Sequence, residues 1–356
     1  MIEMKIENDI KLDFNDVLLR PKRSTLSSRS DVSVIREFKF KHSGSTWSGV
    51  PVISSNMDTV SSVEMFKSLA RNQMLTCFHK YININDIITV CNSNEHEYYN
   101  SDYFILSTGI TDNDFGNLEK NVKLLTENGI ELKFVCIDVA NGYMFKLIDF
   151  CKRIRELLPN VTLIAGNVVS REITEELVIN GKIDIIKVGI GSGAVCTTRL
   201  QTGVGMPQLS AVMECADAAH GLNAAIVSDG GICQPGDLGK AFGGGADFVM
   251  LGSMLAGHTE CPGDLITDTD GSQYKLFYGM SSDTAMNKYH GGVASYRSSE
   301  GKTVRVPYKG DVQETINNML GGVRSTCTYI GASRIKDISK CATFVRVNRQ
   351  VNTFYK

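Results

Sequence analysis

The stretch TLIAGNVVSREITEELVINGKIDIIKVGI, residues 162–190, contains one complete strand–helix–strand unit. The runs 162–168 and 183–190 are almost continuously apolar, which is typical of parallel strands buried on both faces. Between them, Ser170 can cap the start of a helix, and Gly181 can end it in the left-handed conformation. This unit predicts an α/β fold with a parallel sheet.

Similar apolar runs recur along the chain, and each is followed by a helix-like stretch. Their starts are separated by 21 to 41 residues, about the length of one strand plus one helix. Eight such units predict a single closed (β/α)8 TIM barrel that occupies residues 1–356. The expected strands are 51–57, 75–80, 103–109, 133–139, 162–168, 183–190, 224–229 and 247–252.

Two segments depart from this period. The longest interval, between the sixth and seventh strands, opens with a glycine-rich loop that leads to Cys196. After the eighth strand, an excursion over 270–310 predicts a hairpin turned at Asp270-Gly271, a short helix stopped by Gly291 and a polar, mobile flap. Loops that follow barrel strands carry the active site, so both segments are expected at the functional rim.

Composition excludes several classes of protein. The 356 residues carry a net charge of −2, which gives no support to a nucleic-acid partner or an anionic membrane. Charged residues interrupt the first 20 positions, so we expect no signal peptide, no membrane partner and a cytoplasmic location. None of the ten cysteines are spaced two to four residues apart, which argues against zinc ribbons and dithiol redox motifs.

Glycine turns follow the seventh and eighth strands. The seventh ends in Ser228-Asp229-Gly230-Gly231, and Pro235 can open the next helix. The eighth ends in Gly252-Ser253. Barrels often hold a phosphate between these two loops, on backbone N–H groups. The alternative is that they are merely tight strand-to-helix turns.

The loop GIGSGAVCTTR, residues 189–199, places a cysteine on the functional rim. Thr197 and Thr198 supply hydroxyls, and Arg199 supplies a positive charge, which favours a nucleophilic thiolate at Cys196. The alternative is a buried, inert thiol. The glycine spacing does not match a dinucleotide fingerprint, but the carbonyls of such a loop could coordinate a monovalent cation.

Three carboxylates stand out by position. Asp138 and Asp229 lie near the ends of the fourth and seventh strands, and Glu300 lies in the rim excursion. Any one of them alone would more often be a turn or surface residue than a catalytic group. The six histidines show no metal-binding spacing, and His220 and His258 are interpreted as structural.

Taken together, the motifs resemble the IMP dehydrogenase/GMP reductase family, and the likeness covers nearly the whole chain. The motifs that carry it are LDFNDVLLRP (12–21), GSGAVCTTR (191–199), TGVG (202–205), SDGG (228–231), YGMSS (278–282) and SEGK (299–302). Ser192 stands where the family usually has proline, which predicts a more flexible loop.

Within the family, the chain resembles the reductase branch. Dehydrogenases usually carry a regulatory pair of nucleotide-sensing (CBS) modules after the second barrel unit. Here the second and third strands start 28 residues apart, which leaves no room for that insert. The dehydrogenase flap also carries an Arg-Tyr pair, whereas this chain has Tyr296-Arg297. A dehydrogenase that has lost its insert and a catalytically silent nucleotide-binding protein remain the alternatives.

The resemblance implies an oxidoreductase of purine metabolism that converts GMP to IMP with NADPH and releases ammonia. In this reaction Cys196 attacks C2 of the purine and forms a covalent thioimidate, to which NADPH delivers a hydride. Thr198 and Glu300 would manage the proton of the leaving amine.

The resemblance also implies the remaining sites and a homotetrameric assembly. Substrate-binding residues would be Asp229, Gly230, Gly231, Gly252, Ser253, Gly279, Met280, Ser281, Arg297, Ser298, Ser299 and Gly301. Cofactor-binding residues would be Ser28, Arg29, Lys80, Asp138, Val139, Ala140, Asn141, Ile190, Gly191, Met280, Tyr296, Arg297, Ser325, Thr326, Cys327 and Thr328. A potassium ion would lie at Gly191, Gly193, Cys196 and Arg199.

Overall fold

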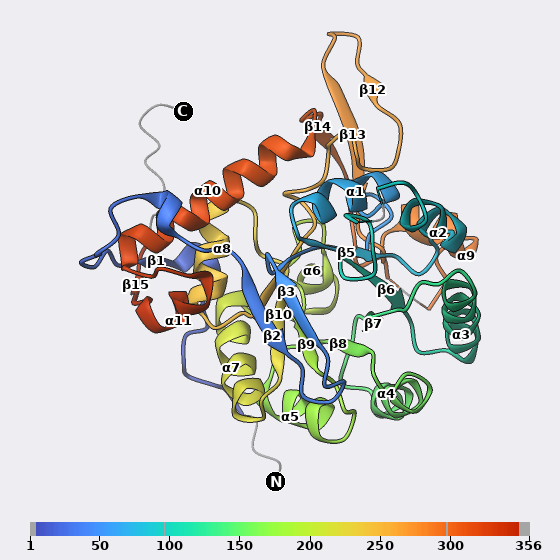
Figure 1. Cartoon of the computed structure of the whole chain (residues 1–356), viewed down its shortest axis with the longest axis horizontal. Helices are drawn as coiled ribbons and strands as arrows, with labels where there is room; N and C mark the ends of the chain where they lie inside the picture. Colours follow the sequence, from blue (N-terminus) through green and yellow to red (C-terminus); the bar gives the residue numbers. More distant parts are fainter. Residues whose placement is uncertain (1–4, 96, 297, 349–356) are drawn as a thin grey trace.

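Eight parallel strands close into a barrel (Figure 1). The computed structural model describes residues 5–95, 97–296 and 298–348. All eight strands predicted from the sequence are present, and the (β/α)8 barrel is confirmed. They are β4 (Val52–Ser54), β5 (Leu75–Phe78), β6 (Phe104–Thr108), β7 (Phe134–Asp138), β8 (Thr162–Val168), β9 (Ile185–Val188), β10 (Ala225–Asp229) and β11 (Phe248–Leu251).

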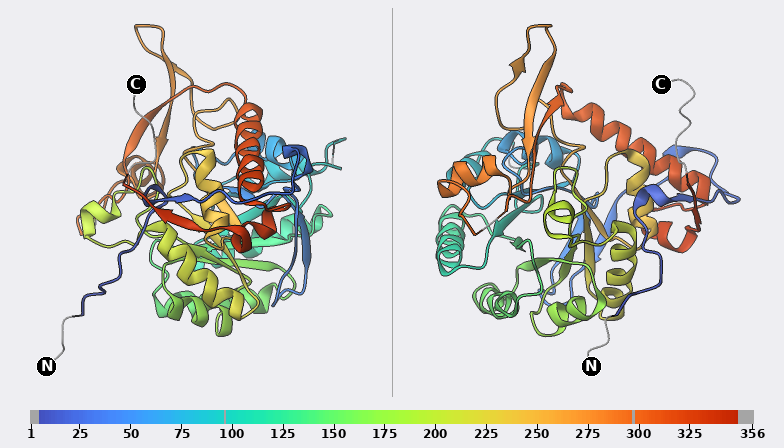
Figure 2. Two further views of the ribbon diagram at one scale, coloured as in Figure 1. Left: turned by 90° about the vertical axis from the view of Figure 1, so that its left-hand side faces the viewer. Right: turned by 180° about the vertical axis from the view of Figure 1, so that it is seen from behind.

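Helices surround the barrel (Figure 2), because each crossover between parallel strands packs one helix on the outside of the sheet. The helix α10 takes the eighth position after the long excursion that follows β11. The main helices are α1 (Val63–Arg71), α2 (Ile84–Cys91), α3 (Asp112–Glu127), α4 (Phe145–Leu157), α5 (Arg171–Ile179), α7 (Gln208–Gly221), α8 (Pro235–Gly243) and α10 (Val312–Ile330).

The strand–helix–strand unit of residues 162–190 forms as predicted, but its helix is capped differently. The helix α5 follows Ser170, whose side chain makes no cap hydrogen bond and instead accepts one from the Tyr143 hydroxyl at 3.1 Å. Lys182, with φ of +55°, takes the left-handed conformation that was expected of Gly181. Gly181 is needed for space, because a Cβ there would lie 2.7 Å from the carbonyl oxygen of Leu177.

Apolar side chains fill the interior of the barrel, and a hairpin covers its N-terminal end. The hairpin pairs β2 (Arg36–Lys39) with β3 (Thr46–Gly49), and it places Phe40 and Trp47 against the barrel core. The ring of Trp47 lies 5.5 Å from that of Phe248 on β11. This end of the barrel is therefore closed, and ligands must enter from the other end.

Two buried carboxylates fasten the same N-terminal end. Asp184 is fully buried and accepts hydrogen bonds from Arg155 at 2.7 Å and from the backbone N–H of His42 at 2.7 Å. Asp247 is paired with Arg36 and with His220, whose Nε2 lies 2.8 Å from the carboxylate. These pairs connect the barrel to the helices and the covering hairpin.

The excursion after β11 begins with a hairpin that projects beyond the barrel in both views of Figure 2. Gly271 turns it with φ of +83°, and α9 ends at Gly291 with φ of +72°, both as predicted. The sequence analysis predicted a polar, mobile flap after this helix and no further strand, whereas 303–307 pairs with the hairpin. Its elements are β12 (Ile266–Thr267), β13 (Gln273–Tyr278), α9 (Asp283–His290) and β14 (Thr303–Pro307).

The two ends of the described chain meet at one side of the barrel. The strand β1 (Val17–Leu19) pairs antiparallel with β15 (Phe344–Arg346). Figure 1 shows α10 running from the neighbourhood of β14 to that of β1. Among the helices of the described residues, none combines the length and apolar character needed to cross a bilayer.

Candidate active site

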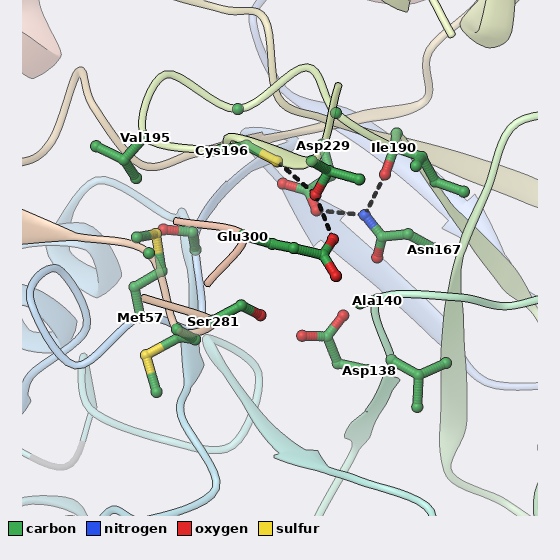
Figure 3. Close-up of a pocket in the computed structure, with 18 of the residues that line it drawn as sticks. Met57, Asp138, Ala140, Asn167, Ile190, Val195, Cys196, Asp229, Ser281 and Glu300 are labelled. Carbon is green, nitrogen blue, oxygen red and sulfur yellow. Dashed lines mark hydrogen bonds between the residues drawn. The ribbon is translucent and has the colours of Figure 1, made fainter. Parts of the chain in front are cut away.

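A cavity of about 250 Å³ opens at the C-terminal end of the barrel (Figure 3). Its walls come from the loops after β4, β7, β8, β9 and β10 and from the excursion after β11. The structure thereby brings together segments that are far apart in the sequence. The predicted site residues that line it are Asp138, Val139, Ala140, Ile190, Gly191, Gly193, Cys196, Thr198, Asp229, Gly279, Met280, Ser281 and Glu300.

The loop after β9 carries the candidate nucleophile. Gly189 has φ of +148°, and a Cβ there would lie 2.0 Å from the carbonyl oxygen of Asp229, so glycine lets this loop pass close to the end of β10. Ser192 donates a hydrogen bond of 3.3 Å to that same carbonyl. The loop then turns at Gly193, whose carbonyl accepts the N–H of Cys196 at 3.0 Å, just before α6 (Thr198–Thr202). Cys196 is half-buried at the wall of the cavity, in contrast to the inert, buried thiol considered from the sequence.

A line of three polar side chains runs from this cysteine. The Cys196 thiol donates to the Thr198 hydroxyl at 3.2 Å, and that hydroxyl donates to a carboxylate oxygen of Glu300 at 2.7 Å. Figure 3 shows Glu300 reaching into the cavity between Cys196 and Asp138. A thiol, a hydroxyl and a carboxylate in this order can pass a proton between the nucleophile and the acid.

Backbone contacts hold Glu300 over the cysteine loop. The Glu300 carbonyl accepts the N–H of Thr197 at 2.9 Å, and the Glu300 N–H donates to the carbonyl of Ser281 at 3.1 Å. Two residues further on, the N–H of Lys302 donates to the carbonyl of Val195 at 2.9 Å. The flap segment is therefore clamped between two loops of the rim, which sets the distance from Glu300 to Thr198.

A buried cation connects two carboxylates on the opposite wall. Lys187 on β9 contacts Asp138 at 2.9 Å and Asp229 at 2.5 Å, and it donates to the Asn167 side-chain oxygen at 2.9 Å. Burial opposes ionisation of Asp138, yet the charge of Lys187 and a hydrogen bond from Asn56 keep its pKa below the usual value. The sequence analysis missed Lys187, although a lone lysine in the apolar run IIKV was a usable signal.

The two predicted phosphate loops lie beside the cavity. Gly230 and Gly231 have φ values of +103° and +77°, and α8 begins at Pro235 as predicted. In the other loop, the Ser253 carbonyl accepts a hydrogen bond of 3.2 Å from Lys309, which the sequence analysis did not select. Burial lowers the pKa of Lys309.

Three residues after β4 complete the cavity and were also missed. Ser55, Asn56 and Met57 line its wall, and Asn56 donates to Asp138 at 2.8 Å. The Ser55 hydroxyl is buried and lacks a hydrogen-bond partner among the described residues. Their position at the end of the first barrel strand was the available signal, since strand ends form the rim.

The flap residues around Glu300 are partly described. Ser299 accepts a hydrogen bond from the N–H of Asp283 at 3.1 Å, and Gly301 forms a bridge with Cys196. Ser298 is exposed, as is Tyr296 with 87% of its surface accessible. Arg297, predicted to bind both substrate and cofactor, lies outside the described residues.

The predicted cofactor residues fall into two groups. Asp138, Val139, Ala140, Ile190, Gly191 and Met280 line the main cavity. Asn141 and Lys80 do not line this cavity. The Asn141 side-chain oxygen accepts the N–H of Tyr143 at 3.0 Å, and Lys80 pairs with Asp114 at 3.0 Å.

The second group lies elsewhere in the chain. Ser28, Arg29 and Thr328 line a separate cavity near the C-terminal end of α10. Figure 1 shows that end of α10 at the opposite edge of the molecule from α2 and α3. Ser325 and Thr326 donate to carbonyls of α10 itself, and the Cys327 side chain is buried in the core. Within one copy of the chain, the described residues of this group do not line the cavity that contains Cys196.

The metal prediction involves backbone carbonyls rather than side chains. Within the described ranges, His, Cys, Asp and Glu side chains form no cluster of three that could bind a metal ion. Arg199 lies against Gly191, and its guanidinium donates to Asp13 at 3.1 Å and to the Met206 carbonyl at 2.7 Å. Its side chain therefore braces the loop and is no ligand for a cation.

Comparison with known proteins places this architecture in a family. The family model of the IMP dehydrogenase / GMP reductase domain matches residues 11–352. GMP reductase 2 of Homo sapiens is 55% identical over 98% of this chain and 98% of its own length. GMP reductase of Salmonella typhi is 55% identical over 99% of both chains, and that of Onchocerca volvulus is 53% identical over 98% of this chain and 94% of its own.

The matches run through the barrel and the excursion alike, so they cover the cysteine loop and the segment that carries Glu300. The barrel topology, the cysteine loop and the match over 11–352 agree, and the chain belongs to the IMP dehydrogenase/GMP reductase family.

Proposed function

We propose that the protein is a GMP reductase, which converts GMP to IMP with NADPH and releases ammonia. The observation that carries the proposal is the line from the Cys196 thiol through Thr198 to Glu300 at the mouth of the barrel. Relatives named GMP reductase, 53–55% identical over nearly the full length, support the same activity.

In the first half of the reaction, the Cys196 sulfur attacks C2 of the purine. The thiol proton passes through Thr198 to Glu300, which then protonates the amine at C2. The C2–N bond breaks, ammonia leaves, and C2 remains bound to sulfur as a thioimidate. Splitting the reaction in this way replaces one difficult step by two easier ones.

In the second half, C2 accepts a hydride from NADPH, which supplies the two electrons of the reduction. The C2–S bond then breaks, IMP is released, and the Cys196 sulfur takes up a proton from solvent. The flap that carries Glu300 covers the reacting atoms and limits the access of water, which would otherwise hydrolyse the thioimidate.

Asp229 and the glycine loops hold the nucleotide. The Asp229 carboxylate borders the cavity and can accept hydrogen bonds from ribose hydroxyls. Backbone N–H groups of Gly231, Gly252 and Ser253 would bind the phosphate near the start of α8. Gly279, Met280, Ser281 and the flap residues would complete the purine pocket.

The split cofactor residues fit an assembly of several copies. Asp138, Asn141 and Lys80 would receive the nicotinamide end of NADPH beside Cys196. Ser28, Arg29 and the 325–328 stretch of a neighbouring copy would receive the other end, within the homotetramer suggested by the family resemblance. Arg29→Ala should then raise the KM for NADPH and leave that for GMP unchanged. An unchanged KM for NADPH would remove this group from the cofactor site.

Potassium is proposed at the cysteine loop, where the donor set is chemically suitable. The carbonyls of Gly191, Gly193 and Cys196 are neutral oxygens, which suit a weakly hydrated monovalent ion better than a divalent one. The charge of Arg199 is paired with Asp13, so it need not repel the ion. Replacing K⁺ by Li⁺ at matched ionic strength should lower activity, and equal activity in both would exclude a functional ion.

A paired assay tests the function and separates it from the related dehydrogenase. The purified protein is incubated with GMP and NADPH, or with IMP and NAD, and the absorbance of the reduced nicotinamide is followed. Loss of NADPH with GMP and no reaction with IMP supports the proposal. Formation of NADH with IMP would identify a dehydrogenase, and binding of GMP without turnover in either mixture would identify a silent nucleotide-binding protein.

We also propose that the enzyme is located in the cytoplasm.

A further inference from the structure

Four neighbouring strands contribute to one polar network under the pocket. Asp138 ends β7, Asn167 lies on β8, Lys187 lies on β9, and Asp229 ends β10. The Lys187 ammonium lies at hydrogen-bond distance from all three partners, with its shortest contact to Asp229 at 2.5 Å. Asn167 in turn donates to Asp229 at 2.8 Å, which closes the network.

The charged side chains of the network differ in their exposure to solvent. The Lys187 side chain is 5% exposed, whereas the side chains of Asp138 and Asp229 are 30% and 21% exposed. Lys187 therefore borders the cavity with little of its surface, and its ammonium is occupied by partners within the protein. Both carboxylates keep surface in the cavity, where ligands bind.

The position of Lys187 is built into the barrel. Gly166 faces it from β8, and a Cβ there would lie 2.7 Å from the Lys187 Cβ. Beneath the ammonium lies the apolar barrel core, which includes Cys77, Cys136 and Ile164. An uncompensated pair of carboxylates above this core would be costly, because burial disfavours charge.

We infer that Lys187 is a positioning residue that offsets the repulsion between the Asp138 and Asp229 carboxylates and fixes their separation, so that the cofactor side and the ribose side of the pocket form at the same time. The inference rests on the proposed function, which assigns Asp138 to NADPH and Asp229 to the ribose of GMP.

Electrostatics supports this role. The three charged groups carry a net charge of −1, so one cation serves two carboxylates. Burial opposes the charged form of Lys187, but Asp138 and Asp229 raise its pKa well above the usual value. Without it, two close carboxylates would compete, and one would take up a proton more readily as the pH falls.

Other ionisable groups near the network are accounted for. Cys136 on β7 and Cys77 on β5 lie in the barrel interior below Lys187, and burial raises the pKa of Cys77. Lys80 acts on Asp138 from the end of β5, and Glu300 lines the same cavity from the flap. Among these, Lys187 is the cation that contacts both carboxylates.

The test compares three variants of the full-length enzyme. Lys187→Met removes the charge, Lys187→Gln keeps a hydrogen-bond donor without the charge, and Lys275→Met serves as a matched control. Lys275 is a buried lysine on β13 that donates to the carbonyls of Thr259 and Cys261, and it does not line the cavity. The readouts are the KM for GMP, the KM for NADPH and their dependence on pH. Calorimetric binding of GMP without NADPH is measured in parallel.

Both Lys187 variants should raise the two KM values about tenfold or more, as expected when a charge-assisted contact is lost. The increase should grow as the pH falls, and the variants should acquire an acidic limb in kcat/KM that the wild type lacks. If Lys187→Met does not fold, Lys187→Gln carries the test. KM values and pH profiles matching those of Lys275→Met and the wild type would overturn the inference.

The two proposals fail in different ways. If the wild type does not turn over GMP with NADPH, the proposed function fails. The affinity for GMP still reports on Asp229 in that case, because calorimetry needs no turnover. Weaker, pH-dependent binding of GMP to Lys187→Gln would then support the inference, and unchanged binding would contradict it.

Discussion

The two ends of the barrel both contain buried ion pairs, but the pairs are built differently. At the N-terminal end, the Asp184 side chain is fully buried and accepts four hydrogen bonds. Three of them come from the backbone N–H groups of His42, Ser43 and Leu163. At the C-terminal end, Asp138 and Asp229 share Lys187 and still face the cavity. Asp184 therefore forms its hydrogen bonds within the protein, whereas Asp138 and Asp229 keep part of their surface for ligands.

The difference separates stability from function along one set of strands. Barrel enzymes carry their chemistry on the C-terminal face, and here the covering hairpin closes the opposite face. Removing groups at the functional end should therefore damage catalysis and spare folding. Removing groups at the closed end should do the reverse. Four variants test this division, from the largest expected effect to the smallest.

The largest effect is expected for Cys196→Ala. Turnover should fall by more than about a thousandfold, because no other thiol lies among the described residues that line the cavity. GMP should still bind, since its phosphate and ribose contacts lie elsewhere, and the melting temperature should stay close to that of the wild type. Steady-state assays, calorimetry and thermal unfolding check these three expectations. Substantial remaining turnover would show that catalysis is not covalent through Cys196.

Glu300→Gln sharpens the comparison within the functional end. Glutamine keeps the size of the side chain and can still hydrogen-bond, but it cannot carry the proton. Release of ammonia should slow by about a hundredfold or more, as for other general acid–base groups. Binding of GMP and NADPH should change much less. Single-turnover experiments that measure ammonia directly provide the check. Near-normal release would show that Glu300 takes no part in the chemistry and that the flap only covers the site.

Asp184→Asn tests the closed end. The substitution leaves the guanidinium of Arg155, which is 13% exposed, without its charged partner. Breaking a buried pair in this way should lower the free energy of unfolding by about 3–5 kcal/mol. The kcat of the folded enzyme should match the wild type. Denaturant unfolding and active-site titration measure the two quantities, and a large loss of kcat with intact stability would break the comparison.

The smallest effect is expected at His220. Its hydrogen bond to Asp247 raises the pKa of the imidazole, although burial acts in the opposite direction. The protonated form therefore contributes stability below the unfolded pKa of about 6.5, and this contribution is lost as the pH rises through the folded pKa. His220 is 45% exposed, so the effect should be small.

A matched variant isolates this contribution. His220→Gln keeps a polar side chain without the titration, so the difference in melting temperature between wild type and variant should shrink as the pH rises. Activity should be the same in both proteins at every pH. A difference that grows with pH would contradict the raised pKa of His220. The protonated His220–Asp247 pair would then not stabilise the folded protein.

Much of this architecture could be predicted from local sequence. Apolar runs long enough to be buried strands indicated all eight barrel strands, and the glycine and hydroxyl pattern around Cys196 indicated its loop. The helix stop at Gly291 and the hairpin turn at Gly271 also follow from local backbone requirements.

The parts that were missed depend on long-range contacts. The partners of Lys187 lie 20, 42 and 49 residues away, and no local pattern indicates that they converge. The strand β14 is only five residues long, and its regular structure comes from pairing with β13, although the alternating valines of TVRVP were a usable signal. Likewise, only the fold shows that Ser28 and Thr328 share a cavity away from Cys196.

The claim that the reaction passes through a thioimidate on Cys196 is tested most directly by the order of two events, the release of ammonia and the transfer of hydride. The wild-type enzyme is mixed with GMP and NADPH under single-turnover conditions, and ammonia and oxidised cofactor are measured in the same quenched samples. The amine must leave C2 before hydride reaches it, so ammonia should equal or exceed the oxidised cofactor at every time. Oxidised cofactor that accumulates ahead of ammonia would contradict the thioimidate route.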